Sequence, residues 1–426
     1  MSRLPASLVA YRLATGLAEP LVPLLLDRRA RRGKEDPARL GERLGRAGVA
    51  RPPGPVAWLH GASVGEALSL LPLIDALAQA RPDLTLLVTS GTRTAAELLG
   101  RRLPPHAIHQ YAPVDGPAAT RRFLDFWRPS LGVFVESELW PNLLLQARAR
   151  GVRLALLSAK LSDASLRNWT RFGEAARALL GAFDLVLAQD ERAAGRLASL
   201  GIEAAGLADL KFGAAPLPAD EAALAALRTE IGERPVILAA STHPGEDALI
   251  LARFADAMEI PPLAARAPLL VIVPRHPERG AAVASLAADD GLAVSRQGAG
   301  EPIGEAQVRV ADALGELGLW YRLASLAVIG GSLVDGVGGH NPLEPARLGC
   351  AFVSGPLVAN WQSAYAGLID AQATVLVANG ALDRWLADGI ERAPILPAMA
   401  ARAAAFVAAR DGEARAVAER LLVLIR

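Results

Sequence analysis

The feature that most limits the fold of this chain is an alternation of short apolar runs with segments of helical periodicity. Between residue 55 and about residue 206, the runs are PVAWL, LTLLVTS, LGVFVES, RLALLS and DLVLAQ. Strands that are buried on both faces appear as continuous apolar runs, and the helices between them provide the crossovers that parallel strands need. The alternation therefore predicts a parallel β-sheet wrapped by helices.

A second series of the same kind begins near residue 233, with PVILAAS, LLVIVPR, LAVS, VRVA, LAVIGGS, AFVSG and TVLVAN. Between the two series, FGAAPLPADEAALAALRTE interrupts the pattern with two prolines, and we interpret residues 213–232 as a linker. The 426 residues thus predict two similar α/β domains, 49–212 and 233–396. We expect the alanine-rich residues 397–426 to form a helix that packs back toward the first domain.

The N-terminal residues 1–48 combine an apolar stretch, ASLVAYRLATGLAEPLVPLLL, with a basic one, DRRARRGKE. Four residues interrupt the apolar stretch, namely Arg12, Glu19, Pro20 and Pro23, whereas a spanning helix needs about 20 nearly uninterrupted apolar residues. The five Arg and Lys residues that follow could meet anionic headgroups at a cytoplasmic membrane face. A helix lying on the membrane and a core-packed helix followed by a solvated basic turn are equal alternatives. A cleaved signal is not favoured.

Composition excludes several classes of function. The 45 Lys and Arg against 44 Asp and Glu give a net charge of +1, so no overall field would gather nucleic acid. Cys350 is the single cysteine, which excludes an internal disulfide and favours a reducing, cytoplasmic compartment. The sequence contains no D-x-D, no H-E-x-x-H and no Cys-rich spacing, so no catalytic metal and no other cofactor is implied.

Polar residues follow several predicted strands in the second half of the chain. Ser241, Thr242 and His243 come after VILAA, and Arg275 and His276 come after LLVIV. Because open α/β sheets bind ligands beyond the carboxyl ends of their strands, these loops are candidate ligand sites. The guanidinium of Arg275 could bond two phosphate oxygens, although a surface salt bridge is an equal alternative. We assign no chemistry to His276.

The loop GGSLVDGVGGHNPLEPA contains five glycines before a helix expected to start at Pro342, with Asn341 as the N-cap and Glu344 three residues later. Glycines let a backbone approach a ligand, and a helix N-terminus presents free N–H groups to a phosphate. The alternative is a connector that ends in an ordinary capping box. The loop has no Walker G-K-[ST], and no G-x-G-x-x-G opens the first strand-to-helix turn, which argues against a dinucleotide dehydrogenase.

Glu66 lies where WLHGASVGEALSLLPLIDAL passes from an apolar strand through a turn into a helix. The residues from Ser63 to Glu66 match the S-x-x-E capping box, which by itself explains this carboxylate. The turn also follows the first strand of the sheet, where catalytic groups are expected. On the residues alone the cap is favoured, and a catalytic role is the alternative.

Glu136 and Glu138, in FVESELWPN, lie at the far end of a predicted strand and, by the two-residue period of a strand, on one face. Paired carboxylates in this position could act in acid/base catalysis or bind hydroxyl groups. The alternative, slightly favoured by the residues alone, is that both cap the helix expected to begin near Trp140 and Pro141.

Together these pieces resemble the 3-deoxy-D-manno-octulosonic acid (Kdo) transferases of lipopolysaccharide synthesis. The resemblance covers nearly the whole chain and rests on RRGKEDPARLGERLG, HGASVGE, APVDGPAATRRFLDFWRP, ESELWPN, SAKLSDAS, DLKF, STHPGE, PRHPER, DALGELGLWY, GGSLV and GGHNPLEPA, in this order. It implies a GT-B fold, with two Rossmann-like domains whose parallel sheets face an interdomain cleft. It also implies inverting transfer from CMP-Kdo to a lipid A precursor at the cytoplasmic face of the inner membrane.

Residue by residue, the resemblance implies that Glu66 is the general base and that Glu136 and Glu138 lie beside the acceptor. The basic stretch with Arg32 and Lys34, together with the apolar anchor, would suit a lipid acceptor. Donor binding is implied for residues of the interdomain motif and the C-terminal loops: Lys211, Ser241, Thr242, Arg275, Gly331, Ser332, Asn341 and Glu344.

Three positions depart from the usual family pattern: Lys160 stands where arginine is common, Asp209 where asparagine is common, and Leu357 where histidine is frequent. These departures leave the fine contacts of the donor pocket and the acceptor open. Two alternatives to Kdo transfer are a GT-B enzyme with another nucleotide-sugar donor and an inactive protein that binds a lipid A precursor.

Overall fold

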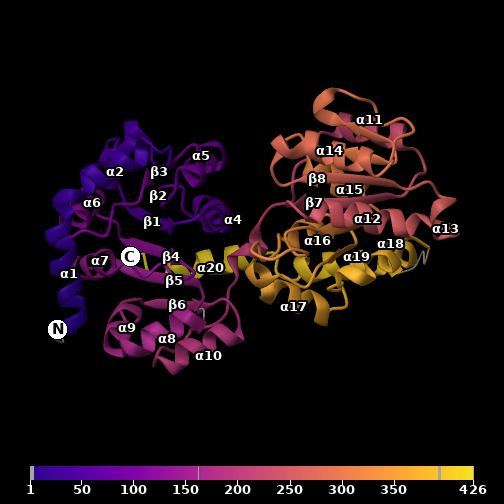
Figure 1. Ribbon diagram of the computed structural model, residues 1–426. Coiled ribbons are helices and arrows are strands. Elements are labelled where there is room, and N and C mark those ends of the chain that lie inside the picture. The colour runs from indigo at the N-terminus through magenta and orange to yellow at the C-terminus, as the bar shows by residue number, and fades with distance from the viewer. Residues whose placement is uncertain (1–3, 162, 392–394, 426) are drawn as a thin grey trace. The chain divides into compact units, whose positions relative to one another are not determined.

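The computed structural model describes residues 4–161, 163–391 and 395–425. The chain forms two compact units, each built around its own sheet (Figure 1). Unit 1 comprises Met1–Ala214 and Asp411–Arg426, and unit 2 comprises Ala215–Arg410. The α/β architecture predicted from the alternating runs is therefore confirmed in both halves of the chain.

The sheet of unit 1 has six parallel strands in the order β3-β2-β1-β4-β5-β6. The strands are β1 (Val56–Gly61), β2 (Thr85–Ser90), β3 (Ala107–Tyr111), β4 (Leu131–Val135), β5 (Arg153–Ala159) and β6 (Leu185–Ala188). The strand order reverses between β1 and β4. In open α/β sheets such a reversal opens a crevice at the carboxyl ends of the strands, where ligands bind.

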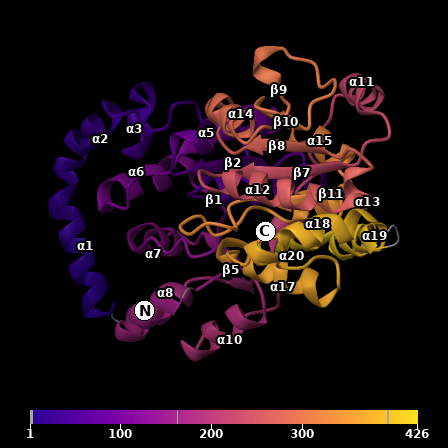
Figure 2. The same cartoon turned by 45° about the vertical axis from the view of Figure 1, so that its right-hand side comes forward.

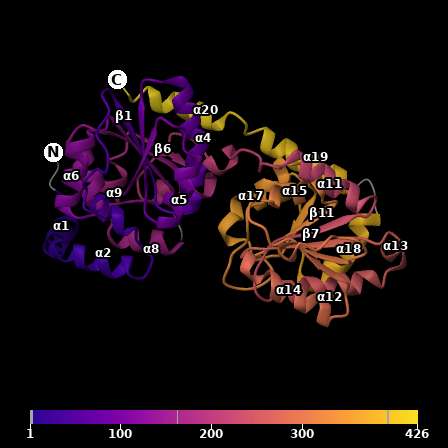
Figure 3. The same cartoon turned by 90° about the horizontal axis from the view of Figure 1, so that it is seen from above.

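Helices cover both faces of this sheet (Figure 3). Alternate residues of β1 enter different cores, because side chains of a strand point to opposite faces. Trp58 packs against Phe123 and Phe134 on one face, and Leu59 packs with Leu70 on the other. The first face carries α6 (Pro117–Trp127), α7 (Pro141–Ala149), α8 (Asp163–Arg171), α9 (Gly173–Leu180) and α10 (Glu191–Ser199). The second carries α4 (Val64–Ala80), α5 (Arg93–Arg102) and α20 (Glu413–Leu422).

The N-terminal residues lie along the outside of unit 1 (Figure 2). They form α1 (Ala6–Ala18), η1 (Glu19–Leu21), α2 (Val22–Ala30), η2 (Pro37–Arg39) and α3 (Leu40–Arg43). Three polar side chains attach this segment to the unit. The Tyr11 hydroxyl donates to Asp115 (3.0 Å), the Asn142 amide donates to Thr15 (2.9 Å), and Glu19 accepts two backbone N–H groups at the start of α6 (2.6 and 2.8 Å).

The other side of this N-terminal segment is apolar and open to solvent. Its exposed side chains include Leu13, Leu17, Leu21, Leu24 and Leu25. The alternative of a core-packed first helix is therefore wrong. Among the described residues, Ala6–Ala30 is the one helical stretch long and apolar enough to cross a membrane, by length and composition alone, with a mean hydropathy of 1.3.

The sheet of unit 2 also has six parallel strands, in the order β12-β11-β7-β8-β10-β9. The strands are β7 (Val236–Thr242), β8 (Leu269–Pro274), β9 (Val294–Arg296), β10 (Val308–Val310), β11 (Leu326–Ile329) and β12 (Phe352–Ser354). The helices are α11 (Glu221–Ile231), α12 (Glu246–Met258), α13 (Pro261–Ala264), α14 (Gly280–Asp289), α15 (Leu317–Leu323), α16 (Leu343–Arg347), α17 (Gln362–Asp370), α18 (Leu382–Glu391) and α19 (Ile395–Ala408). Here the strand order reverses between β7 and β11.

Short 3-10 turns complete the chain: η3 (Leu210–Gly213), η4 (Pro277–Arg279), η5 (Gln297–Ala299), η6 (Ala359–Trp361) and η7 (Asn379–Ala381). The sequence analysis missed β3 and assigned one strand wrongly, because TVLVAN makes only an isolated bridge between Ser354 and Leu376.

The ends of the two units also differ from the predicted boundaries. The predicted linker 213–232 contains α11, which Asp220 caps by accepting the N–H groups of Ala222 and Ala223. The predicted C-terminal helix is two helices, because the chain turns at Gly412 (φ 95°) between α19 in unit 2 and α20 in unit 1. The N-terminal segment, described from residue 4, belongs to unit 1 and is not a unit of its own.

Candidate active site

Glu66 occupies the first turn of α4, directly beyond the end of β1. Its N–H donates to the Ser63 hydroxyl oxygen (3.3 Å), and that hydroxyl donates to Glu66 Oε1 (2.8 Å). Glu66 Oε2 accepts the N–H of Ala62 (2.7 Å) rather than that of the N-cap residue. The predicted cap is therefore confirmed, with the reciprocal bond shifted by one residue. Each carboxylate oxygen retains a second lone pair.

Burial raises the pKa of Glu66, and the nearby charges of Glu138 and Glu136 act in the same direction. The bonds from Ser63 and Ala62 partly oppose this rise. A carboxylate with a raised pKa is a stronger base than an exposed one. Glu66 thus makes the hydrogen bonds of a helix cap and also has the raised pKa that suits a general base.

Glu138 lies in the turn after β4 and extends toward the end of β1. Its Oε2 accepts the indole N–H of Trp140 (2.5 Å) and lies 3.7 Å from His60 Nε2. Burial opposes ionisation of Glu138, but His60 and Trp140 outweigh it and lower the pKa of this carboxyl. Glu66 and Glu138 are therefore neighbouring carboxylates whose environments shift their pKa values in opposite directions, which is how acid/base pairs are recognised.

Glu136 faces a different partner from Glu138. β4 ends at Val135, and Glu136 adopts a left-handed conformation (φ 58°), so the two-residue period of the strand does not continue. The prediction that Glu136 and Glu138 share one face is therefore wrong. Glu136 Oε1 forms an ion pair with Lys211 Nζ (2.7 Å), and both residues belong to unit 1.

The helix after ESELWPN is capped by a residue from another loop. Asp115, which follows β3, accepts the N–H of Asn142 (3.1 Å) and of Leu143 (2.8 Å) in the first turn of α7. The N-cap residue Trp140 makes no side-chain capping bond. The alternative that Glu136 and Glu138 cap this helix is therefore wrong, and the two carboxylates are available for other contacts.

In unit 2, the buried carboxylate of Glu246 organises the loop after β11. It accepts the N–H groups of Gly331 (2.6 Å), Ser332 (2.9 Å) and Leu333 (2.9 Å), and that of His243 (2.9 Å). Ser332 is fully buried, and its hydroxyl donates to Ile329. Gly331 and Ser332 were predicted to bind the donor, and their N–H groups are bonded within the protein. Glu246 is the last residue of the STHPGE motif, but it was not predicted as a site residue.

Ser241 and Thr242 differ in their environments although they are adjacent. Thr242 is fully buried, and its hydroxyl donates to Asp247 (2.5 Å). This side chain therefore fixes the end of β7 and is not accessible to a ligand. Ser241 is half-buried and left-handed (φ 59°), at an irregularity in the last residues of β7. Of the two, Ser241 is the one placed to contact a ligand.

Arg275 lies with three histidines from three separate loops. His243 Nε2 is 2.9 Å from His340 Nε2, and the His243 and His276 ring centroids are 6.1 Å apart. Burial lowers the pKa of His243, and burial with the neighbouring His243 lowers the pKa of His340 to about 4. Both imidazoles are neutral at pH 7, so the exposed Arg275 supplies the positive charge here. His276, to which we assigned no chemistry, borders this cluster.

Asn341 and Glu344 lie next to the same cluster. The Asn341 side chain accepts the N–H of Leu343 (3.0 Å) and donates to Glu344 Oε1 (3.3 Å). The N-cap residue of the helix is Pro342, so the prediction of Asn341 as the N-cap is wrong by one residue. Burial raises the pKa of Glu344, and Asn341 and Arg275 oppose the rise. The helix that follows, α16, has only five residues and begins at Leu343, one residue later than predicted.

The basic stretch of the N-terminal segment is partly neutralised. Arg29 pairs with the buried Glu35 (2.8 Å), and Arg31 pairs with Asp27 (2.8 Å). Arg32 and Lys34 are exposed, and within the described part of the chain no carboxylate lies within ion-pairing distance of either. The described part of the chain contains no group of three or more His, Cys, Asp or Glu side chains that could hold a metal ion.

Comparison with known proteins gives the family. The family model described as 3-deoxy-D-manno-octulosonic-acid transferase (kdotransferase) matches residues 38–214. The 3-deoxy-D-manno-octulosonic acid transferase of Bordetella pertussis is 36% identical over 96% of this chain and 98% of its own length. This chain belongs to the 3-deoxy-D-manno-octulosonic acid transferase family. The Haemophilus influenzae enzyme of the same name is 34% identical over 83% of this chain and 82% of its own length.

A solved structure supports the fold of this Kdo transferase. MurG of Acinetobacter baumannii has a TM-score of 0.54 at 13% identity and covers 87% of this chain and 100% of its own. At such identity the likeness concerns the fold alone, and it confirms the predicted GT-B type. The C-terminal CMP-Kdo binding domain of WaaA from Acinetobacter baumannii is 32% identical and covers 44% of this chain and 96% of its own, with a TM-score of 0.40.

Replacing Glu246 by glutamine tests the role of its carboxylate. Glutamine has one acceptor oxygen, and its amide donors would face backbone N–H groups. We expect Glu246→Gln to lower the free energy of unfolding by about 3 kcal/mol, the scale for lost bonds to a buried charge, as measured by urea denaturation. Hydrogen exchange at residues 331–333 should accelerate. Glu259→Gln, at an exposed position of the same unit, is the control. Equal stability and equal exchange in both variants would contradict this role.

Proposed function

We propose that this protein moves Kdo from CMP-Kdo to a lipid A precursor with inversion at the anomeric carbon. The observation that carries the proposal is the group of carboxylates beyond β1 and β4, in a chain of the Kdo transferase family. Glu66 and Glu138 belong to this group, and their opposite pKa shifts suit one base and one residue that stays ionised.

In the proposed reaction, a hydroxyl of the acceptor attacks the anomeric carbon of Kdo. Glu66 takes the hydroxyl proton as the new C–O bond forms and the bond to the CMP phosphate breaks. Glu138 and Glu136 would accept hydrogen bonds from neighbouring hydroxyls of the acceptor. Lys211, which pairs with Glu136, would hold that carboxylate in place. CMP leaves with the electron pair of the broken bond.

The donor would bind at the loops of unit 2, where the exposed Arg275 lies beside the histidine cluster. Its planar guanidinium suits the single phosphate of CMP-Kdo and would stabilise the charge on the departing CMP. Ser241, Asn341 and Glu344 lie near it and offer polar groups to the donor. Thr242, Gly331 and Ser332 make their hydrogen bonds within the protein and would support these loops.

The acceptor would be reached from a membrane surface. We propose that the protein associates with the cytoplasmic side of the inner membrane through the N-terminal segment, peripherally or as a monotopic protein. The support is the exposed apolar side of α1 and α2 beside Arg32 and Lys34. Leucines can enter the acyl boundary while cationic side chains meet anionic headgroups.

Glu66→Gln separates the capping role from the catalytic one. Glutamine can fill the capping position but cannot take the proton, so we expect unchanged thermal stability and CMP binding. Kdo transfer should fall by at least about 100-fold. In the wild-type enzyme, transfer should be lost as the pH falls through a value above the ordinary pKa of a glutamate, because the raised pKa of Glu66 moves its protonation upward.

The exposed Glu203→Gln variant is the control for charge removal and should transfer Kdo at the wild-type rate. Near wild-type transfer by Glu66→Gln would show that Glu66 is only a cap. The base would then have to be sought at Glu136 or Glu138.

Arg275→Ala tests the donor site. Loss of a charged partner of the phosphate should weaken CMP binding by about 2 to 4 kcal/mol in calorimetry. Arg228→Ala, at an exposed position of α11, should bind CMP as the wild type does. An unchanged CMP affinity in Arg275→Ala would remove this residue from the phosphate site.

Leu17→Asp tests the membrane-binding side of the N-terminal segment. Leu17 is 82% exposed, and burying a leucine in the acyl boundary is worth about 1.5 to 3 kcal/mol, so binding to anionic liposomes should weaken at least about tenfold. Leu314, in unit 2, is 84% exposed, and Leu314→Asp is the matched control. Equal sedimentation of both variants with liposomes would contradict the proposed orientation.

A further inference from the structure

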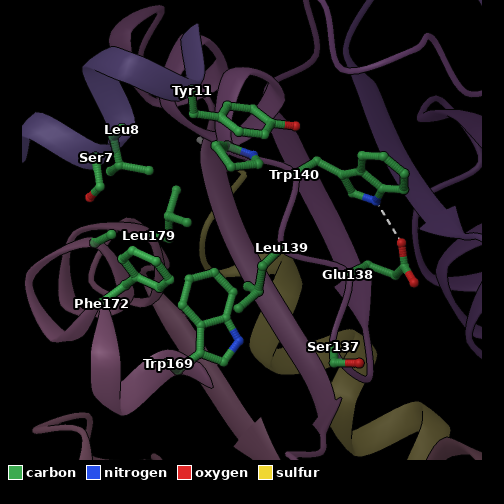
Figure 4. Close-up of a pocket in the computed structure, with 12 residues that line it drawn as sticks. Ser7, Leu8, Tyr11, Ser137, Glu138, Leu139, Trp140, Trp169, Phe172 and Leu179 are labelled. Atoms are coloured by element: carbon green, nitrogen blue, oxygen red, sulfur yellow. Dashed lines mark hydrogen bonds between the residues drawn. The ribbon is translucent and has the colours of Figure 1, made fainter. Parts of the chain in front are cut away.

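Unit 1 contains a cavity of about 520 Å³ between α1, the turn at residues 137–141 and helices α8 and α9 (Figure 4). Its walls are mostly apolar and aromatic and include Leu8, Leu139, Trp169, Phe172 and Leu179. The volume lies within the range of cavities that bind small molecules. The reaction described above uses only one residue of this cavity, Glu138.

Glu138, the one charged residue among those that line the cavity, lies at one end of it. Figure 4 shows Glu138 and the Trp140 N–H on the side opposite to Leu8, Phe172 and Leu179. The Tyr11 hydroxyl is bonded to Asp115, and the Trp140 N–H to Glu138, so neither needs a partner in the cavity. A ligand that fits would have a long apolar part and a polar head beside Glu138.

The position of Glu138 connects this cavity to the carboxylate group. Glu138 lines the cavity, and its charge raises the pKa of Glu66. A ligand whose chain fills the cavity would therefore place its head near the candidate base. The cavity wall also includes Leu8 and Tyr11 of α1, the helix whose other side carries Leu13 and Leu17 exposed. A chain that leaves a bilayer beside α1 would thus reach the cavity along an apolar surface.

We propose that this cavity binds one acyl chain of the acceptor and so fixes the acceptor head beside Glu138 and Glu66. The inference rests on the proposed lipid acceptor and adds a specific subsite for it. Aromatic residues with a polar tip, such as Tyr11 and Trp140, suit the boundary between a chain and a sugar head. The cavity would act on acceptor binding and positioning, and it takes no part in proton transfer.

Two variants change the cavity without touching the carboxylates. Ser7 lines the cavity from an exposed position, and Ser7→Phe would fill it; Phe172 is 56% exposed, and Phe172→Ala would remove part of its wall. For an acylated lipid A precursor, we expect KM to rise about tenfold in each, the equivalent of about two buried CH₂ groups. For the de-acylated, water-soluble acceptor, kcat/KM should stay within about twofold of the wild type.

Leu314→Phe adds an aromatic ring at an exposed position of unit 2, outside the cavity and the membrane-binding side, and is the matched control. Its KM for the acylated acceptor should equal that of the wild type. An unchanged KM in both Ser7→Phe and Phe172→Ala would overturn the inference. An equal fall in kcat/KM for the acylated and the de-acylated acceptor would also overturn it.

A binding assay separates this inference from the proposed function. Trp140 and Trp169 line the cavity, so a dodecyl maltoside with bromine on its alkyl chain should quench their fluorescence whether or not Kdo is transferred. We expect this quenching in the wild type and in Leu314→Phe, with weaker binding in Ser7→Phe and Phe172→Ala. If the enzyme transfers no Kdo to either acceptor, the proposed function fails. The quenching assay then still tests whether the cavity binds an alkyl chain. Absent quenching, or equal binding by all variants, overturns the inference.

Discussion

Carboxylates that accept backbone N–H groups hold the loops at the carboxyl ends of both sheets. Glu66 binds the turn after β1, Asp115 binds the start of α7, and Glu246 binds four N–H groups around the loop after β11. Asp115 and Glu246 fix their loops without facing a ligand, whereas Glu66 does both. Glu138 remains available beyond β4 because Asp115 supplies the capping bonds of α7.

Glu66 shows that a capping role and a catalytic role are compatible. Its bonds to Ser63 and Ala62 fix the orientation of the carboxylate, which a base in a site on a rigid element requires. Burial and the Glu138 charge raise its pKa, which increases its basicity. The N-terminal segment shows a similar division, with polar bonds on one side and exposed leucines on the other.

The sequence predicted the architecture well because buried parallel strands leave continuous apolar runs. It failed where strands are short or polar. β3 reads AIHQY, and its His109 and Gln110 hide the strand, whereas TVLVAN is apolar but lies beyond the edge of the sheet. The capping of α7 by Asp115 and the four bonds of Glu246 could not be predicted, because the partners are distant in the sequence. Family motifs located the neighbourhood of Glu246 but not its partners.

The central claim is that this GT-B protein transfers Kdo from CMP-Kdo to a lipid A precursor. Mass spectrometry of a lipid A precursor incubated with the purified protein and freshly generated CMP-Kdo tests it most directly. The account predicts that the precursor gains the mass of one or more Kdo units, that CMP is released in equal number, and that Glu66→Gln produces neither change at a comparable rate. An unchanged precursor, or a gain of mass from another nucleotide sugar in place of CMP-Kdo, would contradict the claim.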